Sequence, residues 1–284
     1  MEFNKYISPL GEEKLMEALA KIKHVALDMD GTIYMGSTLF PYTIKFLDTL
    51  TAHGISYSFL TNNPTKSHKD YLLKLEKLGI HATDEQMYTS SLATIDYIRQ
   101  HHPEAKRLFT LGTPSMQEEF VKAGFQLCAD DPADRPDLLV VAFDTTLEYS
   151  RLCRATWWAS KPEIPYIATN PDWVCPTWYG SVPDCGSVCE MLHRATGREP
   201  EFIGKPRPAM VRLALEGTGY PPEAAVLLGD RLYTDIACAV NAGIDSVFVL
   251  SGEGTRDDIE RDGIRPTWVY DDINAVFRAW EETP

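Results

Sequence analysis

The regular alternation of short apolar runs with stretches of helical character limits this chain to a few folds. Near the N-terminus, His24–Asp28 and Ile55–Leu60 are apolar runs of strand length. Residues 41–53 and 65–78 read as helices, and each stretch is followed directly by a glycine, a common helix terminator. Strands that alternate with helices predict a parallel sheet covered by helices.

The same alternation returns toward the C-terminus. Ala225–Leu228 and Ser246–Leu250 read as strands, and the residues from about 234 to 241 read as a helix that stops at Gly243. At the other end of the chain, residues 11–22 carry apolar side chains at helical spacing and predict a further helix. The two ends therefore look like two parts of one parallel sheet.

A second α/β set lies between these two groups. Its expected strands are residues 107–111, 138–143 and 165–168. Its expected helices are residues 91–101, 115–123, 147–160 and 187–196. Residues 170–186, rich in proline, tryptophan and glycine, are expected to form an irregular loop. We therefore predict an α/β core in two parts, residues 1–87 and 197–284, with an inserted α/β domain at residues 88–196.

The composition excludes several classes of partner. The 284 residues include 41 acidic and 27 basic side chains, a formal net charge of −14, which repels nucleic acid and anionic membranes. No apolar stretch approaches the roughly 18 residues of a membrane span. The first twenty residues also have no apolar core of signal-peptide type. The six cysteines form no CxxC pair, so we expect reduced thiols and a cytoplasmic protein.

Four short polar segments carry the expected chemistry, and each follows a predicted strand. The first, Asp28-Met29-Asp30-Gly31-Thr32, places two carboxylates two residues apart. One carboxylate can attack phosphorus as a nucleophile, and the other can move the proton of the leaving oxygen. A solvated acidic turn is the alternative, which the preceding apolar strand disfavours. This segment therefore favours phosphoryl-transfer chemistry.

The second and third segments offer groups that bind phosphate oxygens. Thr61, Asn62 and Asn63 supply a hydroxyl, side-chain amides and the N–H groups of a strand-to-helix turn, although alone they could form a plain helix N-cap. Lys205 stands between glycine and proline, which fixes its direction, and it can neutralise a carboxylate and a phosphate together. An isolated surface lysine is more commonly just solvated.

The fourth segment, Gly229–Asp235, supplies two further carboxylates. Asp230 together with Asp28 would give Mg²⁺, a hard cation that prefers oxygen, two carboxylate ligands. Asp235 is better placed to orient the loop or the lysine, or to cap the following helix. Open α/β sheets bind ligands at the carboxyl ends of their strands, so we expect all four segments to contribute to one site.

The segments ALDMDGT, FLTNNP, IGKPRP and GDRLYTDI resemble the four motifs of the haloacid dehalogenase (HAD) superfamily. TSSLAT at residues 89–94 and IATNPD at residues 167–172 further resemble the branch with a type IIA cap, the NagD-like and p-nitrophenylphosphatase-like proteins. The resemblance covers nearly the whole chain. It implies a Rossmann-like core with an inserted α/β cap. It also implies a Mg²⁺-dependent phosphomonoesterase that acts on a small phosphorylated metabolite, such as a sugar phosphate, through an aspartyl-phosphate.

The resemblance also implies a role for each motif residue. Asp28 matches the aspartyl nucleophile, which also contacts the metal. Asp30 matches the general acid/base, whose backbone carbonyl is expected to bind Mg²⁺. The other matches are the phosphate-binding Thr61 with Asn62 and Asn63 beside it, the third-motif Lys205, the Mg²⁺ ligand Asp230, and Asp235 as the second acidic residue of the fourth motif.

In this reading the inserted cap recognises the leaving group. Asn170 and Asp172 can hydrogen-bond substrate hydroxyls, while Trp173, Trp178 and Tyr179 can stack on a ring or pack a domain interface. The resemblance implies a homodimer that pairs through the caps. A phosphotransferase or mutase, and a metabolite-binding protein with little turnover, are the alternative functions; the complete set of motif residues argues against the latter.

Overall fold

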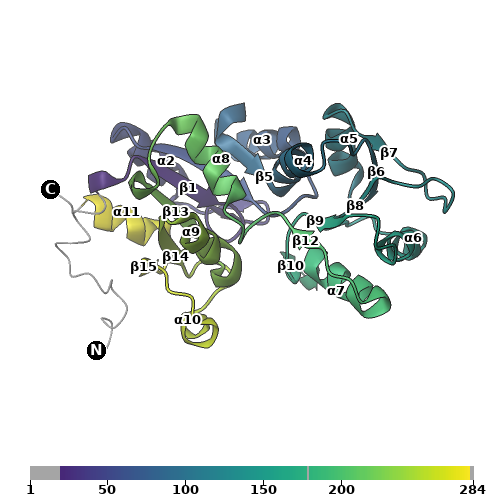
Figure 1. The fold of residues 1–284 in the computed structure, drawn as a ribbon. Coiled ribbons are helices and arrows are strands. Elements are labelled where there is room, and N and C mark those ends of the chain that lie inside the picture. Colours follow the sequence, from purple (N-terminus) through teal and green to yellow (C-terminus); the bar gives the residue numbers. More distant parts are fainter. Residues whose placement is uncertain (1–19, 178, 282–284) are drawn as a thin grey trace. The chain divides into compact units, whose positions relative to one another are not determined.

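A computed structural model describes residues 20–177 and 179–281, in which the chain divides into two compact units (Figure 1). Of the described residues, the first unit contains those up to Thr61, Lys74–Tyr88, and those from Pro206 onward. The second unit contains Asn62–Leu73 and Thr89–Lys205. The boundaries drawn from the sequence near residues 87 and 197 stay a prediction.

The first unit is built on a six-stranded sheet with the strand order β15-β14-β13-β1-β4-β5. Its strands are β1 (His24–Asp28), β4 (Ser56–Thr61), β5 (Met87–Thr89), β13 (Ala225–Gly229), β14 (Asp245–Val249) and β15 (Trp268–Tyr270). The central strand β1 pairs in parallel with β13 on one side and β4 on the other. Both β1 and β13 are buried throughout, as their continuous apolar runs predict.

Helices cover this sheet. They are α2 (Thr43–Ala52), α8 (Ala209–Thr218), α9 (Ala237–Ala242), α10 (Arg256–Asp262) and α11 (Ile273–Glu281), while α3 (His68–Lys77) runs from the second unit into the first. The helix predicted near 234–241 instead begins as a π-helical turn, Leu232–Ile236, before α9. The helix predicted at residues 11–22 lies almost entirely outside the described residues.

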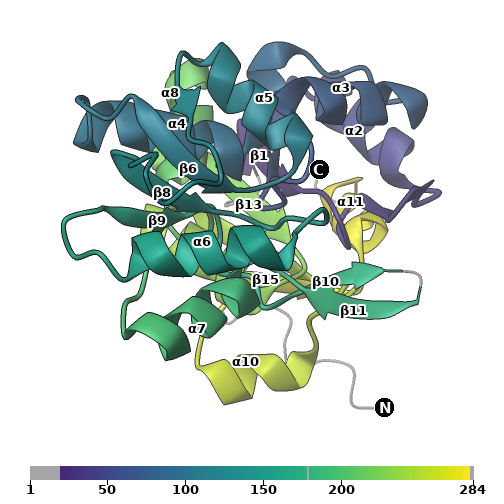
Figure 2. The same ribbon diagram turned by 90° about the vertical axis from the view of Figure 1, so that its right-hand side faces the viewer.

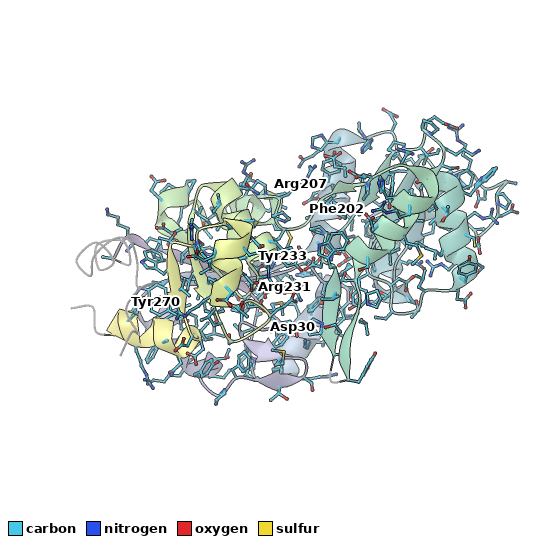
Figure 3. All side chains as sticks on the ribbon, turned by 90° about the horizontal axis from the view of Figure 1, so that it is seen from below. Asp30, Phe202, Arg207, Arg231, Tyr233 and Tyr270 are labelled. Atoms are coloured by element: carbon cyan, nitrogen blue, oxygen red, sulfur yellow. The ribbon has the colours of Figure 1, made fainter. Side chains whose placement is uncertain are left out.

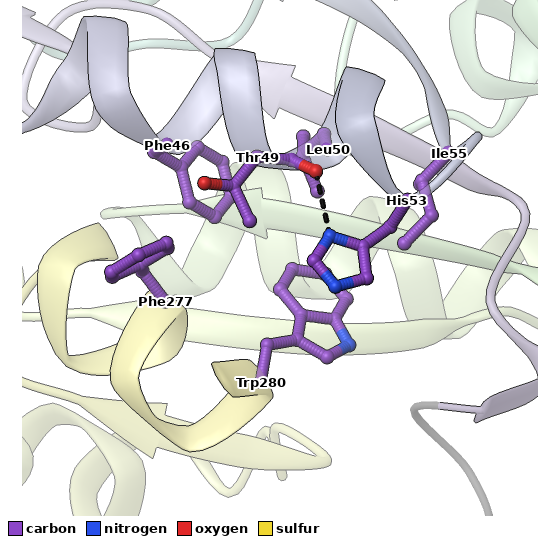
Figure 4. Close-up of a pocket in the computed structure, with 7 residues that line it drawn as sticks. All are labelled: Phe46, Thr49, Leu50, His53, Ile55, Phe277 and Trp280. Carbon is purple, nitrogen blue, oxygen red and sulfur yellow. Dashed lines mark hydrogen bonds between the residues drawn. The ribbon is translucent and has the colours of Figure 1, made fainter. Parts of the chain in front are cut away.

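A small apolar pocket lies between α2 and α11 (Figure 4). Its lining consists of Phe46, Thr49, Leu50, His53, Ile55, Phe277 and Trp280. The His53 Nδ1 is already hydrogen-bonded to the backbone carbonyl of Thr49 at 2.9 Å. The lining offers no carboxylate or ammonium group, so this pocket lacks the chemistry that the four polar segments suggest.

The second unit has its own five-stranded parallel sheet, with the strand order β12-β9-β8-β6-β7. Its strands are β6 (Arg107–Leu111), β7 (Gln126–Leu127), β8 (Leu138–Val141), β9 (Tyr166–Ala168) and β12 (Glu201–Phe202). Its helices are α4 (Ser90–His101), α5 (Pro114–Lys122), α6 (Tyr149–Ala159) and α7 (Cys185–Thr196). Figure 2 shows α6 and α7 on one face of this sheet and α4 and α5 on the other.

The stretch at residues 170–186 corrects one prediction. Instead of an irregular loop, it contains an antiparallel hairpin of β10 (Val174–Thr177) and β11 (Gly180–Pro183). Neither strand contains a fully buried residue. The sequence therefore lacks the alternation of apolar and polar residues that would have predicted these two strands. A second hairpin, β2 (Tyr34–Met35) with β3 (Thr38–Leu39), follows β1.

Within the described part of the chain, no helix is long and apolar enough to cross a membrane.

Candidate active site

Three of the four polar segments lie at the carboxyl ends of neighbouring strands in the first unit's sheet. Asp28 is the last residue of β1, and Asp230 directly follows the neighbouring strand β13. Thr61 ends β4, on the other side of β1, where Leu60 is the register partner of Asp28. The parallel topology therefore places these three residues at the same edge of the sheet, as the sequence predicts.

Asp28, Asp230 and Asp235 form a compact group, which we call the carboxylate cluster. Each offers one oxygen, and the three oxygens lie within 4.8 Å of one another. Asp235 reaches this position because the π-helical turn folds back from the end of β13, where its Oδ2 accepts the N–H of Arg231 at 3.0 Å. The sequence predicts that Asp235 orients the loop or the lysine, or caps the following helix, and the structure places its carboxylate with the other two.

Burial makes this concentration of negative charge unfavourable without a counter-charge. Asp230 is 2% exposed, Asp235 is 1% exposed and Asp28 is 9% exposed. Burial, together with the charge of Asp235, raises the pKa of Asp230 to about 7. Asp230 Oδ1 is buried and has no hydrogen-bond partner among the described residues. An orphaned oxygen within a group of carboxylates fits a hard divalent cation.

Asp30 stands apart from the carboxylate cluster and has its own partners. Its Oδ1 accepts the N–H of Gly36 at 3.2 Å, and its Oδ2 lies 3.9 Å from Nζ of Lys74. Lys74 Nζ also lies 3.6 Å from the ring centroid of Tyr34. Burial raises the pKa of Asp30, and the charge of Lys74 opposes that rise. Lys74 was missed from the sequence because nothing distinguishes it from the other lysines of that helix.

The loop Ser251–Gly254, between β14 and α10, was also missed. The N–H of Glu253 donates to Asp230 Oδ2 at 2.7 Å, and the N–H of Gly254 donates to the Asp230 carbonyl at 3.0 Å. The Ser251 hydroxyl donates to the carbonyl of Gly31 at 2.6 Å. A signal was present in the sequence, since this Ser-Gly-Glu-Gly segment also follows a predicted strand directly.

Arg231, labelled in Figure 3, directly follows Asp230 in the sequence. Its Nε lies 2.9 Å from Glu253 Oε2, and the Arg231 side chain is mostly buried. The ion pair therefore joins the segment that carries Asp230 to the loop that hydrogen-bonds it.

In the second unit, the side chain of Asn62 is bonded to the backbone of Lys205 in both directions. The N–H of Lys205 donates to Asn62 Oδ1 at 2.8 Å, and Asn62 Nδ2 donates to the Lys205 carbonyl at 2.9 Å. The same Nδ2 donates to Asp172 Oδ2 at 2.8 Å. Gly204 packs so closely against Asn62 Oδ1 and the Thr169 carbonyl that a Cβ would not fit. Asn62 thus orients Lys205, which is itself buried.

Asn170 and Asp172, predicted to contact substrate, belong to the same buried network. Asn170 is fully buried and Asp172 is 1% exposed. Asn170 Nδ2 donates to Asp172 Oδ2 at 2.8 Å and to Asp184 Oδ1 at 3.0 Å, while its Oδ1 accepts the Thr169 hydroxyl at 2.7 Å. These bonds give the two side chains a structural task, and their contact with substrate stays a prediction.

The remaining predicted contacts are more accessible. Asn63 is half-buried, and its Oδ1 accepts the N–H of Thr65 at 3.0 Å, which shapes the turn after β4. Trp173 and Tyr179, at the hairpin of β10 and β11, are 53% and 66% exposed, so both can meet a ligand. Trp178 lies outside the described residues.

Known proteins resemble this chain in sequence and in fold. Residues 25–126 match the family model of haloacid dehalogenase-like hydrolases, and residues 202–276 match a HAD-hydrolase-like model. An acid sugar phosphatase of Staphylococcus aureus is 32% identical over 264 residues, which cover 93% of this chain and 100% of that protein.

Solved structures of other proteins also resemble this chain. A 4-nitrophenylphosphatase of Thermotoga maritima has a TM-score of 0.84 and 37% identity, over 92% of this chain and 98% of that chain. NagD of E. coli K-12 has a TM-score of 0.77 and 31% identity, over 89% of this chain and 97% of that chain. These two solved structures therefore resemble this chain in sequence as well as in fold.

Proposed function

Because this chain belongs to the haloacid dehalogenase-like hydrolases, we propose that it is a Mg²⁺-dependent phosphomonoesterase of a small phosphorylated metabolite. The observation that carries the proposal is the carboxylate cluster, which lies at the carboxyl ends of β1 and β13. The relatives named acid sugar phosphatase and 4-nitrophenylphosphatase support hydrolysis of a phosphate monoester. The first of these names favours a sugar phosphate as the substrate class.

The donor set supports Mg²⁺ as the cofactor. Asp28 and Asp230 would hold the ion through carboxylate oxygens, and Asp30 through its backbone carbonyl, with Asp235 beside them. Bound Mg²⁺ would reduce the repulsion between the anionic ester and the buried carboxylates, and would polarise a phosphate oxygen. The unpartnered Oδ1 of Asp230 supports this assignment.

The chain's own residues perform the transfer. Asp28 attacks phosphorus and forms an aspartyl-phosphate, while Asp30 gives its proton to the leaving alcohol oxygen. Asp30 then takes a proton from the water that attacks this intermediate, which releases phosphate and restores Asp28. The Thr61 hydroxyl and the Lys205 ammonium bind phosphate oxygens as negative charge develops on them.

We assign recognition of the leaving group to the second unit. The exposed Trp173 and Tyr179 offer apolar faces on which a sugar or an aromatic ring can stack. Substitution of either residue by alanine should raise KM for esters whose leaving group is a ring, p-nitrophenyl phosphate included, more than for an acyclic ester such as glycerol phosphate.

Two further assignments concern the environment of the protein and its oligomeric state. All six cysteines are free thiols in the structure, which supports a reducing, cytoplasmic environment. Pairing of two copies through the second unit follows from the family resemblance alone. The molar mass from light scattering tests it, because a mass near 32 kDa would contradict the dimer.

Phosphate release tests the proposed function directly. Wild-type protein with Mg²⁺ should hydrolyse p-nitrophenyl phosphate and at least one ester of a panel of sugar, glycerol and nucleotide monophosphates. EDTA and Asp28→Asn should each abolish the activity, because one removes the metal and the other the nucleophile. Folded wild-type protein that binds an ester but releases no phosphate would instead indicate a metabolite-binding protein. Transfer of phosphate to an added alcohol or bisphosphate in preference to water would indicate a phosphotransferase.

A further inference from the structure

We propose that the loop Ser251–Gly254 positions Asp230 for the metal and joins the first and fourth polar segments into one rigid site. This inference rests on the proposed function, since it assumes that the carboxylate cluster holds a divalent cation. This loop lies outside the four polar segments and follows β14.

The loop decides which oxygen of Asp230 stays available. The Glu253 N–H engages Oδ2 at 2.7 Å, while Oδ1 keeps no hydrogen-bond partner among the described residues. The Gly254 N–H binds the carbonyl of the same residue at 3.0 Å, so both the backbone and the side chain of Asp230 are fixed. A carboxylate held in this way presents one defined oxygen to a cation and loses little side-chain entropy on binding it.

Gly252 allows the loop to approach this closely. A Cβ built on Gly252 would overlap the Asp230 carboxylate, and one built on Gly31 would meet the same group. The φ angle of Gly31 is +86°, which itself favours glycine, whereas that of Gly252 lies outside the left-handed region. At Gly252 the requirement for glycine therefore comes from contact with Asp230 rather than from backbone conformation.

Ser251 extends the same loop to the first acidic segment. Its hydroxyl donates to the Gly31 carbonyl at 2.6 Å, although the two residues lie 220 positions apart in the sequence. Gly31 follows Asp30, so this bond fixes the peptide next to the backbone carbonyl assigned to the metal. The Arg231–Glu253 ion pair, at 2.9 Å, holds the loop from its other side.

Metal binding without substrate tests this inference. Mn²⁺ can replace Mg²⁺ as a probe, and electron paramagnetic resonance measures the free ion. We expect Gly252→Ala to weaken Mn²⁺ binding by about 10–100-fold, the usual cost of disturbing the groups that orient a metal ligand, because its Cβ would displace the Asp230 carboxylate. Ser251→Ala, which removes only a hydroxyl, should weaken it less, by several-fold. Gly217→Ala is the matched control, because a Cβ there meets only the Tyr88 hydroxyl at 3.4 Å.

The outcomes separate this inference from the proposed function. If Ser251→Ala and a folded Gly252→Ala both bind Mn²⁺ as tightly as wild type, the loop does not position Asp230. If Gly252→Ala fails to fold, Ser251→Ala with an unchanged circular dichroism spectrum decides the matter alone. If wild type binds Mn²⁺ and the variants bind it weakly, but no ester is hydrolysed, the loop's role stands and the proposed phosphatase activity fails.

Discussion

His24, the first residue of β1, makes the stability of the first unit depend on pH. It is 2% exposed, and its Nδ1 and Nε2 each lie 2.9 Å from a serine hydroxyl, those of Ser56 and Ser58. A neutral imidazole can donate from one nitrogen and accept at the other, and a hydroxyl can complement either. Burial lowers the pKa of His24 from 6.5 to about 4, so the folded protein keeps the ring neutral.

The size of the effect follows from that shift. The unfolded chain takes up a proton on His24 near pH 6.5, whereas the folded protein takes it up only near pH 4. The contribution of the neutral His24 to the free energy of unfolding is therefore fully present above pH 6.5, and it is lost as the pH falls toward 4. Between pH 7 and pH 5, linkage of these two pKa values predicts a loss of about 2 kcal/mol in the free energy of unfolding.

Urea unfolding of wild type and His24→Gln at pH 7 and pH 5 measures this loss. Glutamine can donate and accept hydrogen bonds but does not titrate in this range, and the titration of all other groups cancels between the two proteins. We expect the stability difference between wild type and variant to shift by about 2 kcal/mol against wild type at pH 5. An equal difference at both pH values, or a His24 ring that titrates near 6.5 by NMR, would refute the reasoning.

Three further outcomes follow from the site. Asp230→Asn should raise the melting temperature of the metal-free protein by a few degrees, because it removes one of three converging charges, and it should abolish stabilisation by Mg²⁺; scanning fluorimetry measures both. Gly204→Ala should lower kcat/KM at least tenfold, about 1.4 kcal/mol, because its Cβ would displace Asn62; activity equal to wild type would contradict this. Lys74→Met removes the cation 3.9 Å from Asp30 and should lower kcat more than it changes KM in steady-state assays.

The sequence predicted those parts of the fold that burial controls. The strands β1, β6 and β13 are buried on both faces or nearly so, and each appeared as an apolar run at its observed position. The family inferred from the four motifs is confirmed by the relatives and by the parallel sheets. The hairpin of β10 and β11 was missed, since neither strand contains a fully buried residue.

Some features of the site could likewise be predicted from the sequence, and others could not. Parallel strands end at one edge of a sheet, so the common position of Asp28 and Asp230 could be predicted from their place after apolar runs. The bond between Ser251 and Gly31, and those between Asn62 and Lys205, join residues far apart in sequence. A single sequence carries no signal for such pairs, because their residue types are those of any polar turn.

The pairing of β1 with β13 also governs the order in which the molecule can form on the ribosome. Val25 pairs with Val226, so β1 cannot pair with β13 until the entire second unit has been synthesised. That unit's own sheet comes from the continuous stretch between β6 and β12 and can form first. During this interval the edge of β1 that later pairs with β13 stays open, and an unpaired apolar edge favours aggregation. Slow synthesis of about the last sixty residues would prolong the stage of folding at which this protein is most prone to aggregate.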